Sequence, residues 1–104
     1  MWTEALPIVV YSTCTEVVVP AADWARMYGS LQALKGHVQE YPGCQRFDAF
    51  AGVKPEGIRI DVYTTWDTID QVEAYLVRGY TFERMLADLG LSEIEFSDTM
   101  EKIF

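Results

Sequence analysis

The sequence predicts an α+β fold in which strands and helices follow one another in the order β-α-β-β-α-β. Two runs rich in β-branched and aromatic residues, 7–19 and 58–66, are typical of strands. Between them, apolar residues recur every three or four positions over residues 24–41, which is the period of an amphipathic helix. The 104 residues suffice for one hydrophobic core, so residues 1–104 are expected to form a single domain.

The first strand and first helix meet at Pro20. Asp23 is the predicted N-cap of the helix, because its carboxylate can accept from the first backbone amides. Pro42 disfavours helical geometry in the residue before it, and Gly43 can adopt a positive φ, so the helix is expected to end in a tight corner. The apolar stripe of this helix consists of Trp24, Met27, Tyr28, Leu31, Leu34, Val38 and Tyr41.

A hairpin is predicted next, with strands at about 44–51 and 58–66 joined by GVKPEG. Two compact registers keep apolar residues opposite one another. One places Asp48 opposite Arg59 and Arg46 opposite Asp61; the other places the two aspartates opposite each other. Opposite charges across strands contribute about 0.2–1 kcal/mol per pair, so the first register is predicted.

The second half repeats the pattern of helix and strand. Thr68 and Gln71 form a capping box, and Gly79 ends the helix that they begin. Thr81 can cap a short second helix ending at Gly90, and the last strand is expected at about 92–99. The complete order is ferredoxin-like, with an antiparallel sheet in the strand order 4-1-3-2 and the helices on one face.

The other sheet face is expected to carry charged and polar side chains. When helices cover only one side of a sheet, the second face is either exposed to solvent or covered by another chain. A second copy of the same sheet is the simplest cover, so a homodimer is predicted. The residues expected on this face are Arg46, Asp48, Arg59, Asp61 and Tyr63.

Charge and rare residues exclude several classes of function. Sixteen acidic residues against eight basic ones give a formal net charge of −8, which argues against nucleic acid and anionic membranes as partners. No apolar run is long enough for a membrane helix, and no secretory signal is expected, so the predicted location is cytoplasmic. His37 is the only histidine, and Cys14 and Cys44 are isolated, so no metal site and no disulfide are expected.

Three stretches carry a resemblance to a known family: YPGCQRFDAF, YTTWDTIDQVEAY and YTFERMLADLG. In this order, with a hairpin after the first, they resemble the antibiotic biosynthesis monooxygenase (ABM) domain of the dimeric α/β-barrel superfamily over about residues 8–97. The resemblance implies a homodimeric barrel with an apolar pocket between sheet and helices in each subunit. It also implies one of the family's activities: cofactor-free oxidation of quinols or anthrones, haem degradation, or cyclisation or isomerisation of polyketides.

The chain departs from the haem-degrading branch of that family. That branch needs an asparagine on the first strand, a tryptophan on the second helix and a histidine after it. This chain contains no asparagine, Tyr75 stands where the tryptophan would fall, and Met85 and Leu86 lie near the histidine position. Quinol- and anthrone-oxidising members often carry a histidine on the same helix, and here it is absent. The activity that remains, oxidation of quinols or anthrones, is cofactor-free in that family, so no cofactor is expected.

Cofactor-free oxygenation needs a base, a group that stabilises the substrate anion and a dry cavity. Tyr75 and His37 are the candidate catalytic residues; the competing interpretation places both at the helix surface. Trp66 would form a pocket wall, or a core residue with a hydrogen-bonded indole. An apolar cavity of a few hundred Å³ with one or two hydroxyls is expected beside it. The candidate substrate-binding residues are Trp66, Tyr28, Leu31, Val62, Val72 and Phe82.

These observations predict a small cofactor-independent monooxygenase-like oxidoreductase that acts on an apolar substrate of aromatic, polyketide or quinol type. Two alternatives remain open. The first is a non-catalytic homodimeric ligand-binding or regulatory module, and the second is a polyketide cyclase or isomerase on the same fold. The sequence identifies neither the substrate nor whether the chain is catalytic.

Overall fold

The computed structural model describes residues 10–91 and 94–101, so residues 7–9 of the predicted first strand and residues 92–93 of the predicted last strand lie outside the described residues. One four-stranded antiparallel sheet has the order β2-β3-β1-β4, which confirms the predicted strand order. The elements are β1 (Tyr11–Val19), the 3-10 turn η1 (Ala21–Asp23), α1 (Trp24–Gln39), β2 (Cys44–Lys54), β3 (Gly57–Trp66), α2 (Ile69–Arg78), α3 (Phe82–Asp88) and β4 (Ile94–Glu101).

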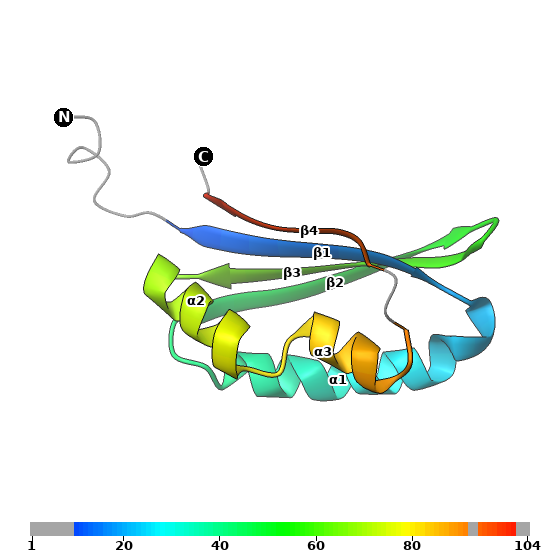
Figure 1. Cartoon of the computed structure of the whole chain (residues 1–104), viewed down its shortest axis with the longest axis horizontal. Helices are drawn as coiled ribbons and strands as arrows, with labels where there is room; N and C mark the ends of the chain where they lie inside the picture. The colour runs from blue at the N-terminus through cyan, green and yellow to red at the C-terminus, as the bar shows by residue number, and fades with distance from the viewer. Residues whose placement is uncertain (1–9, 92–93, 102–104) are drawn as a thin grey trace.

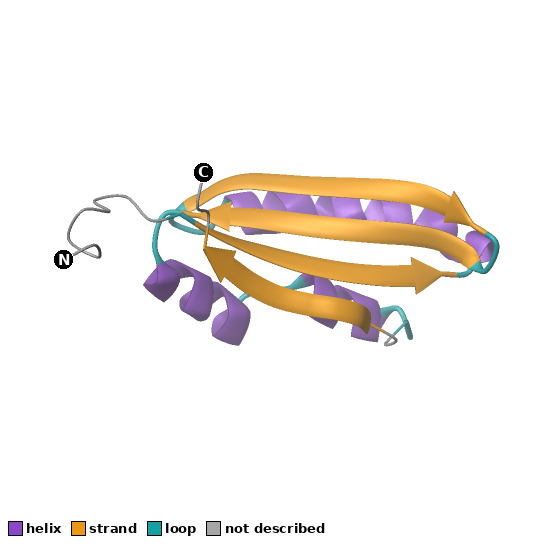
Figure 2. Ribbon diagram, turned by 90° about the horizontal axis from the view of Figure 1, so that it is seen from above, coloured by secondary structure: helices purple, strands orange, loops and turns teal. Residues whose placement is uncertain are grey.

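All three α-helices cover one face of the sheet and leave the other open (Figure 1). Seen from above, α1 lies behind the β2 side of the sheet, and α2 and α3 lie on the β4 side (Figure 2). The α+β, ferredoxin-like fold class is therefore confirmed. The helical layer has two halves, and each half borders a different edge strand.

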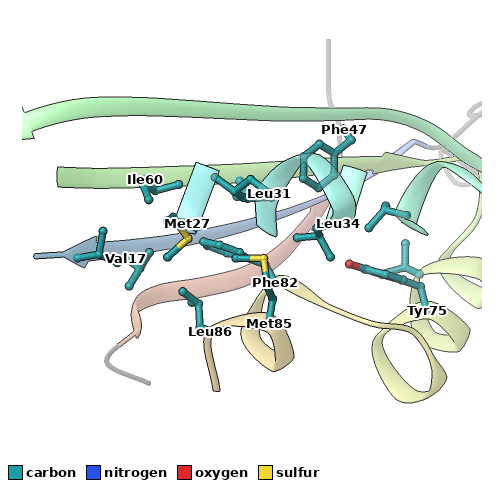
Figure 3. Packing of buried hydrophobic residues seen from close by; sticks show 14 of the residues in the cluster. Val17, Met27, Leu31, Leu34, Phe47, Ile60, Tyr75, Phe82, Met85 and Leu86 are labelled. Carbon is teal, nitrogen blue, oxygen red and sulfur yellow. The ribbon is translucent and has the colours of Figure 1, made fainter. Parts of the chain in front are cut away.

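The core fills the space between the helices and the sheet (Figure 3). Val17 and Ile60 come from the sheet and are 1% exposed, while Met27 and Leu34 of α1 are fully buried. Helix α3 contributes Phe82, Met85 and Leu86, and Tyr75 of α2 closes the cluster at one end. The predicted helical stripes thus supply the core, because residues spaced by three and four share one helix face.

Two of the three predicted N-cap residues make the expected capping hydrogen bond. The Thr68 and Thr81 hydroxyls accept hydrogen bonds from the amides of Gln71 and Arg84, both at 3.2 Å, as predicted for N-caps. Asp23 occupies the N-cap position of α1 but makes no capping bond. Its carboxylate instead pairs with Arg26 at 2.9 Å, because η1 already turns the chain into the helix.

The corner after α1 depends on Gly43. This residue has a φ of 85°, a conformation that side chains other than glycine rarely adopt. A Cβ atom at position 43 would also collide with the side-chain amide of Gln71. The predicted corner is therefore present, and its positive φ is the feature that favours glycine at this position.

The predicted β2–β3 register is wrong. Asp48 lies opposite Tyr63 and Phe50 opposite Asp61, so neither considered register is present. The strands continue to the pair Lys54 and Gly57 and are closed by a two-residue turn. Hairpin register is set by turn length, and exposed ion pairs contribute too little to override it.

Charges on the open face pair along strands and with β1 rather than across the hairpin. Arg46 contacts Asp48 of the same strand at 3.2 Å. The guanidinium of Arg59 contacts Asp61 at 3.0 Å and Glu16 of β1 at 2.7 Å. Because Asp61 hydrogen-bonds it, the pKa of Arg59 is raised further. The open face is polar, as predicted, but its ion pairs are different ones.

Candidate functional site

A cleft of about 610 Å³ lies between the sheet and the helical half formed by α2 and α3. Strand β4 borders it on one side, and residues 81–84, the N-cap and first turn of α3, border it on the other. Its apolar lining is Val62, Leu76, Phe82 and Ala87, and its polar lining is Thr13, Thr15, Thr64, Tyr75, Thr81, Glu83, Arg84, Ser97, Asp98 and Thr99.

Threonine hydroxyls form the sheet side of this cleft. Thr13, Thr15 and Thr64 occupy buried positions on the helix-facing side of β1 and β3. Thr13 and Thr64 are paired across the two strands and share a hydrogen bond. The indole Nε1 of Trp66 donates to Thr64 Oγ1 at 2.8 Å. The expected cavity was apolar with one or two hydroxyls, whereas the observed lining carries several.

Tyr75 projects from α2 into the same region and is only 3% exposed. Its ring stacks on Trp66, and its hydroxyl donates to the carbonyl of Tyr80 at 3.4 Å. Gly79 lies against this ring, and a Cβ there would approach the ring at 2.6 Å. Burial raises the pKa of Tyr75 strongly. The phenol is therefore neutral at physiological pH and can donate a hydrogen bond, but it cannot act as a base there.

Glu83 places a carboxylate in the cleft. Its Oε1 accepts from Ser97 Oγ of β4 at 2.9 Å and from Thr15 Oγ1 of β1 at 3.4 Å. The two hydroxyls are themselves 3.3 Å apart. One helix and two strands thus hold this carboxylate in a single orientation.

Arg84 is the cationic residue of the cleft lining, and backbone carbonyls already engage it. Its Nη2 donates to Val77 O at 2.7 Å, and Nη1 donates to Gly79 O. These bonds tie the end of α2 to the start of α3. The guanidinium therefore fixes the loop beside Tyr75.

The predicted substrate-binding residues do not share one gap. Val62, Phe82 and Tyr75 line the cleft, whereas Tyr28 and Leu31 line a separate groove of about 670 Å³ between α1 and β2. Trp66 and Val72 are fully buried and line neither space, with Trp66 supporting the cleft through Thr64 and Tyr75. The helical stripe is continuous in sequence, but α1 and α2–α3 lie under opposite halves of the sheet.

His37 lies outside the cleft. It is an exposed residue near the end of α1, with its ring 6.1 Å from that of Tyr80. Of the two candidate catalytic side chains, the structure therefore brings only Tyr75 to the cleft.

Sequence reasoning missed the Glu83, Ser97 and Thr15 group. Strand alternation places Thr13 and Thr15 on the same face as Val17 and Val19, and that signal was present. The position of Glu83 follows from the Thr81 cap, which fixes where the first turn of α3 points. Its pairing with Ser97 depends on the β4 register, and that strand has an irregularity at its partners Glu16 and Val17.

The chain has an α+β, ferredoxin-like fold with a cleft between one sheet face and two of its helices. No protein-family model and no curated protein matches the chain. Solved structures do. A candidate antibiotic biosynthesis monooxygenase from Caulobacter crescentus is similar with a TM-score of 0.69 and 17% identity, covering 98% of this chain and 96% of that one.

Two further structures show the same similarity. A candidate antibiotic biosynthesis monooxygenase from Nitrosomonas europaea has a TM-score of 0.66 and 18% identity, with 89% of this chain and 88% of that chain covered. A heme-degrading protein from Mycobacterium tuberculosis, in heme-free form, has a TM-score of 0.59 and 18% identity, with 90% and 93% covered. At these identities the similarity establishes the fold.

The cleft does not fit haem. Its lining contains no histidine and no cysteine, and the single histidine of the chain is on the surface of α1. The phenol of Tyr75 already donates to the Tyr80 carbonyl, and its ring stacks on Trp66. Within residues 10–91 and 94–101, no group of three or more His, Cys, Asp and Glu side chains could hold a metal ion.

No helix in this part of the chain is long and apolar enough to cross a membrane.

Proposed function

We propose that the chain is a cofactor-independent monooxygenase-like protein that oxidises an aromatic substrate of quinol, anthrone or polyketide type in the cleft beside Tyr75. The observation that carries the proposal is the buried, neutral hydroxyl of Tyr75 in a cleft of about 610 Å³. A cleft of this volume suits a molecule of two or three fused rings. The fold shared with ABM-type proteins supports the same conclusion.

The proposed chemistry uses O₂ as the only oxidant. An anthrone loses a proton, and its electron-rich anion gives one electron to O₂. Recombination of the radical pair forms a carbon–oxygen bond and a peroxide, which loses water to leave a new carbonyl. One O₂ is consumed, one oxygen atom enters the product and the other leaves as water. Tyr75 would stabilise the oxygen anion by turning its phenolic hydrogen from the Tyr80 carbonyl, a long bond of 3.4 Å, to the anion, as donors do in oxyanion sites.

The proposal includes a homodimer closed through the open sheet faces. Figure 1 shows that the described helices leave this face uncovered. Phe50 is 61% exposed there and its ring centroid lies 5.9 Å from that of Tyr63, while Phe96 and Met100 of β4 are 43% and 42% exposed. Apolar residues among paired charges are typical of a surface that a partner covers.

The test is O₂ uptake with 1,8-dihydroxyanthrone in chelator-treated buffer without flavin, haem or metal. Wild-type protein should accelerate uptake above the uncatalysed rate. Tyr75→Phe should lower the protein-dependent rate by about 10²-fold, the scale of a lost oxyanion donor. His37→Ala should keep the wild-type rate, because His37 lies outside the cleft.

The same experiment distinguishes the binding module from the enzyme. If no anthrone or quinol consumes O₂ faster with the protein, while aromatic ligands quench tryptophan fluorescence saturably, the chain binds without catalysis. If both the Tyr75→Phe and His37→Ala variants oxidise at the wild-type rate, neither residue serves the reaction.

A further inference from the structure

The Glu83 carboxylate is bound asymmetrically. Both hydroxyl donors, Ser97 Oγ at 2.9 Å and Thr15 Oγ1 at 3.4 Å, contact Oε1. Among the described residues, no donor contacts Oε2. A carboxylate has acceptor positions on both oxygens, so Oε2 remains available to a molecule in the cleft.

The remaining charges of the cleft are unfavourable for an anionic ligand. Glu83 is the carboxylate that enters the cleft from the helical side, and the formal net charge of the chain is −8. Arg84 cannot offset this carboxylate freely, because its guanidinium donates to the carbonyls of Val77 and Gly79. A carboxylate-bearing ligand would therefore enter a negative potential. It would also find no free hydroxyl donor on Thr15 or Ser97, because both already donate to Glu83.

We infer that Glu83 is the acceptor for a substrate hydroxyl, and that the cleft selects neutral aromatic ligands carrying a hydrogen-bond donor over their ethers and carboxylates. The inference deepens the proposed function, since it concerns the same cleft. Thr15 and Ser97 are positioning residues, because they act by holding Glu83. A site built to bind a hydroxyl discriminates strongly against an analogue without it.

Within the proposed reaction, Glu83 is also placed to take the substrate proton. In the enol tautomer of an anthrone the O–H bond breaks, its proton passes to Oε2 and the electron pair stays on the oxygen and the conjugated rings, which gives the same anion as loss of the carbon-bound proton from the keto form. The oxygen anion then faces the neutral Tyr75 phenol, which lines the same cleft and donates rather than accepts. The proton returns when the peroxide loses water, so the carboxylate is regenerated.

Binding measured without O₂ tests the assignment independently of turnover. Three probes differ only at the relevant groups: 1,4-dihydroxynaphthalene, 1,4-dimethoxynaphthalene and 1,4-dihydroxynaphthalene-2-carboxylate. Anaerobic fluorescence titration of wild-type protein should give at least about tenfold tighter binding of the diol than of the diether, the scale of a hydrogen bond to a charged group. The carboxylate should bind more weakly than the diol.

Glu83→Gln should reduce the preference for the diol over the diether by about tenfold and improve binding of the carboxylate. Ser97→Ala should reduce the preference less, because Thr15 still holds Glu83. Glu73→Gln is the matched control: it makes the same charge change on an exposed face of α2 outside the cleft and should behave as wild type. Circular dichroism checks that each variant is folded.

The outcomes separate the two proposals. A Glu83→Gln variant that keeps the full wild-type preference overturns the role of Glu83, even if O₂ uptake by the wild type supports the oxygenase. A wild type that prefers the diol through Glu83 but shows no O₂ uptake supports the recognition role and overturns the oxygenase. A wild type that binds diol and diether equally also overturns the inference.

Discussion

Trp66 and Tyr75 stack with their ring centroids 4.8 Å apart and their planes inclined by 29°. Trp66 ends β3 and Tyr75 lies on the following helix, so the stack joins the sheet to α2. Tyr41 meets the other side of this pair edge-on, with its ring 5.4 Å from that of Tyr75. The orientation of the Tyr75 hydroxyl is therefore set mainly by aromatic packing.

This packing predicts different costs for two substitutions of Tyr75. Tyr75→Ala removes a buried ring and should lower the free energy of unfolding by about 3–5 kcal/mol. Tyr75→Phe keeps the stack and loses one long hydrogen bond, so its cost should be about 1 kcal/mol or less. Urea denaturation followed by tryptophan fluorescence measures both. Equal losses in the two variants would show that the hydroxyl, rather than the ring, stabilises the fold.

Burial of Tyr75 also predicts a loss of stability at high pH. The phenol has a pKa of about 10 in an unfolded chain, and burial raises this pKa in the folded state. Above pH 10 the unfolded chain releases the proton while the folded chain keeps it, so the free energy of unfolding falls as pH rises, by at most about 1.4 kcal/mol per pH unit. Below pH 9 this contribution is constant. Urea midpoints from pH 8 to 11 should fall less steeply for Tyr75→Phe than for the wild type; parallel curves would contradict the prediction.

Gly43, in the corner after α1, and Gly90, just after α3, are two glycines whose substitution can be compared. Both have a positive φ, 85° and 75°, but a Cβ at position 43 would collide with Gln71, while position 90 is open. Gly90→Ala should cost about 1 kcal/mol from backbone strain alone. Gly43→Ala should cost about the same, because the atoms that its Cβ would meet are the end of the flexible Gln71 side chain, which can move away. Thermal or urea unfolding measures both variants.

A second substitution checks that the Gln71 side chain yields at little cost. Gln71 Oε1 is buried without a hydrogen-bond partner, so moving the amide breaks no bond of that oxygen. The loss from Gly43→Ala should therefore be similar in the wild-type and Gln71→Ala backgrounds. A double variant clearly more stable than Gly43→Ala alone would show that the collision, and not the backbone conformation, determines the cost.

The proposed homodimer predicts that Phe50→Glu will separate the subunits. Phe50 lies on the open face opposite Asp61, so a glutamate there adds a like charge to the surface that would be covered. Light scattering at micromolar concentration should change from about twice the chain mass of 11.9 kDa to a single chain mass. Val53→Glu, at an 89% exposed position of the same strand with the opposite side-chain direction, is the control. A wild-type monomer would refute the dimer directly.

Local patterns predicted most of this fold, because each depends on a few neighbouring residues. The corner at Pro42 and Gly43 and the caps at Thr68 and Thr81 follow from backbone preferences and short side-chain reach. The hairpin register could not be obtained in this way. Charge pairing favoured one register, but the two-residue turn before Gly57, which has a φ of 149°, fixes another. Weak exposed ion pairs formed in whatever register the turn imposed.

The candidate site was predicted only in part, for a related reason. Tyr75, Val62 and Phe82 were identified because they belong to apolar stripes, and they do line the cleft. Tyr28 belongs to a stripe too, but it is 53% exposed and faces the groove on the other half of the sheet. Periodicity gives the buried face of each element. Which elements then surround one space is a property of the assembled layers.

The anchoring of Glu83 by Ser97 has a consequence for the nascent chain. Ser97 lies on β4, an edge strand that pairs only with β1 and follows every other described element in the sequence. A ribosome adding about 5–20 residues per second exposes β1 through α3 before this strand. Until β4 emerges, the cleft lacks one wall and its carboxylate lacks its shorter hydrogen bond. A ligand of the cleft would therefore recognise only chains whose translation has passed this strand, and its binding would favour the docking of β4 onto the sheet edge.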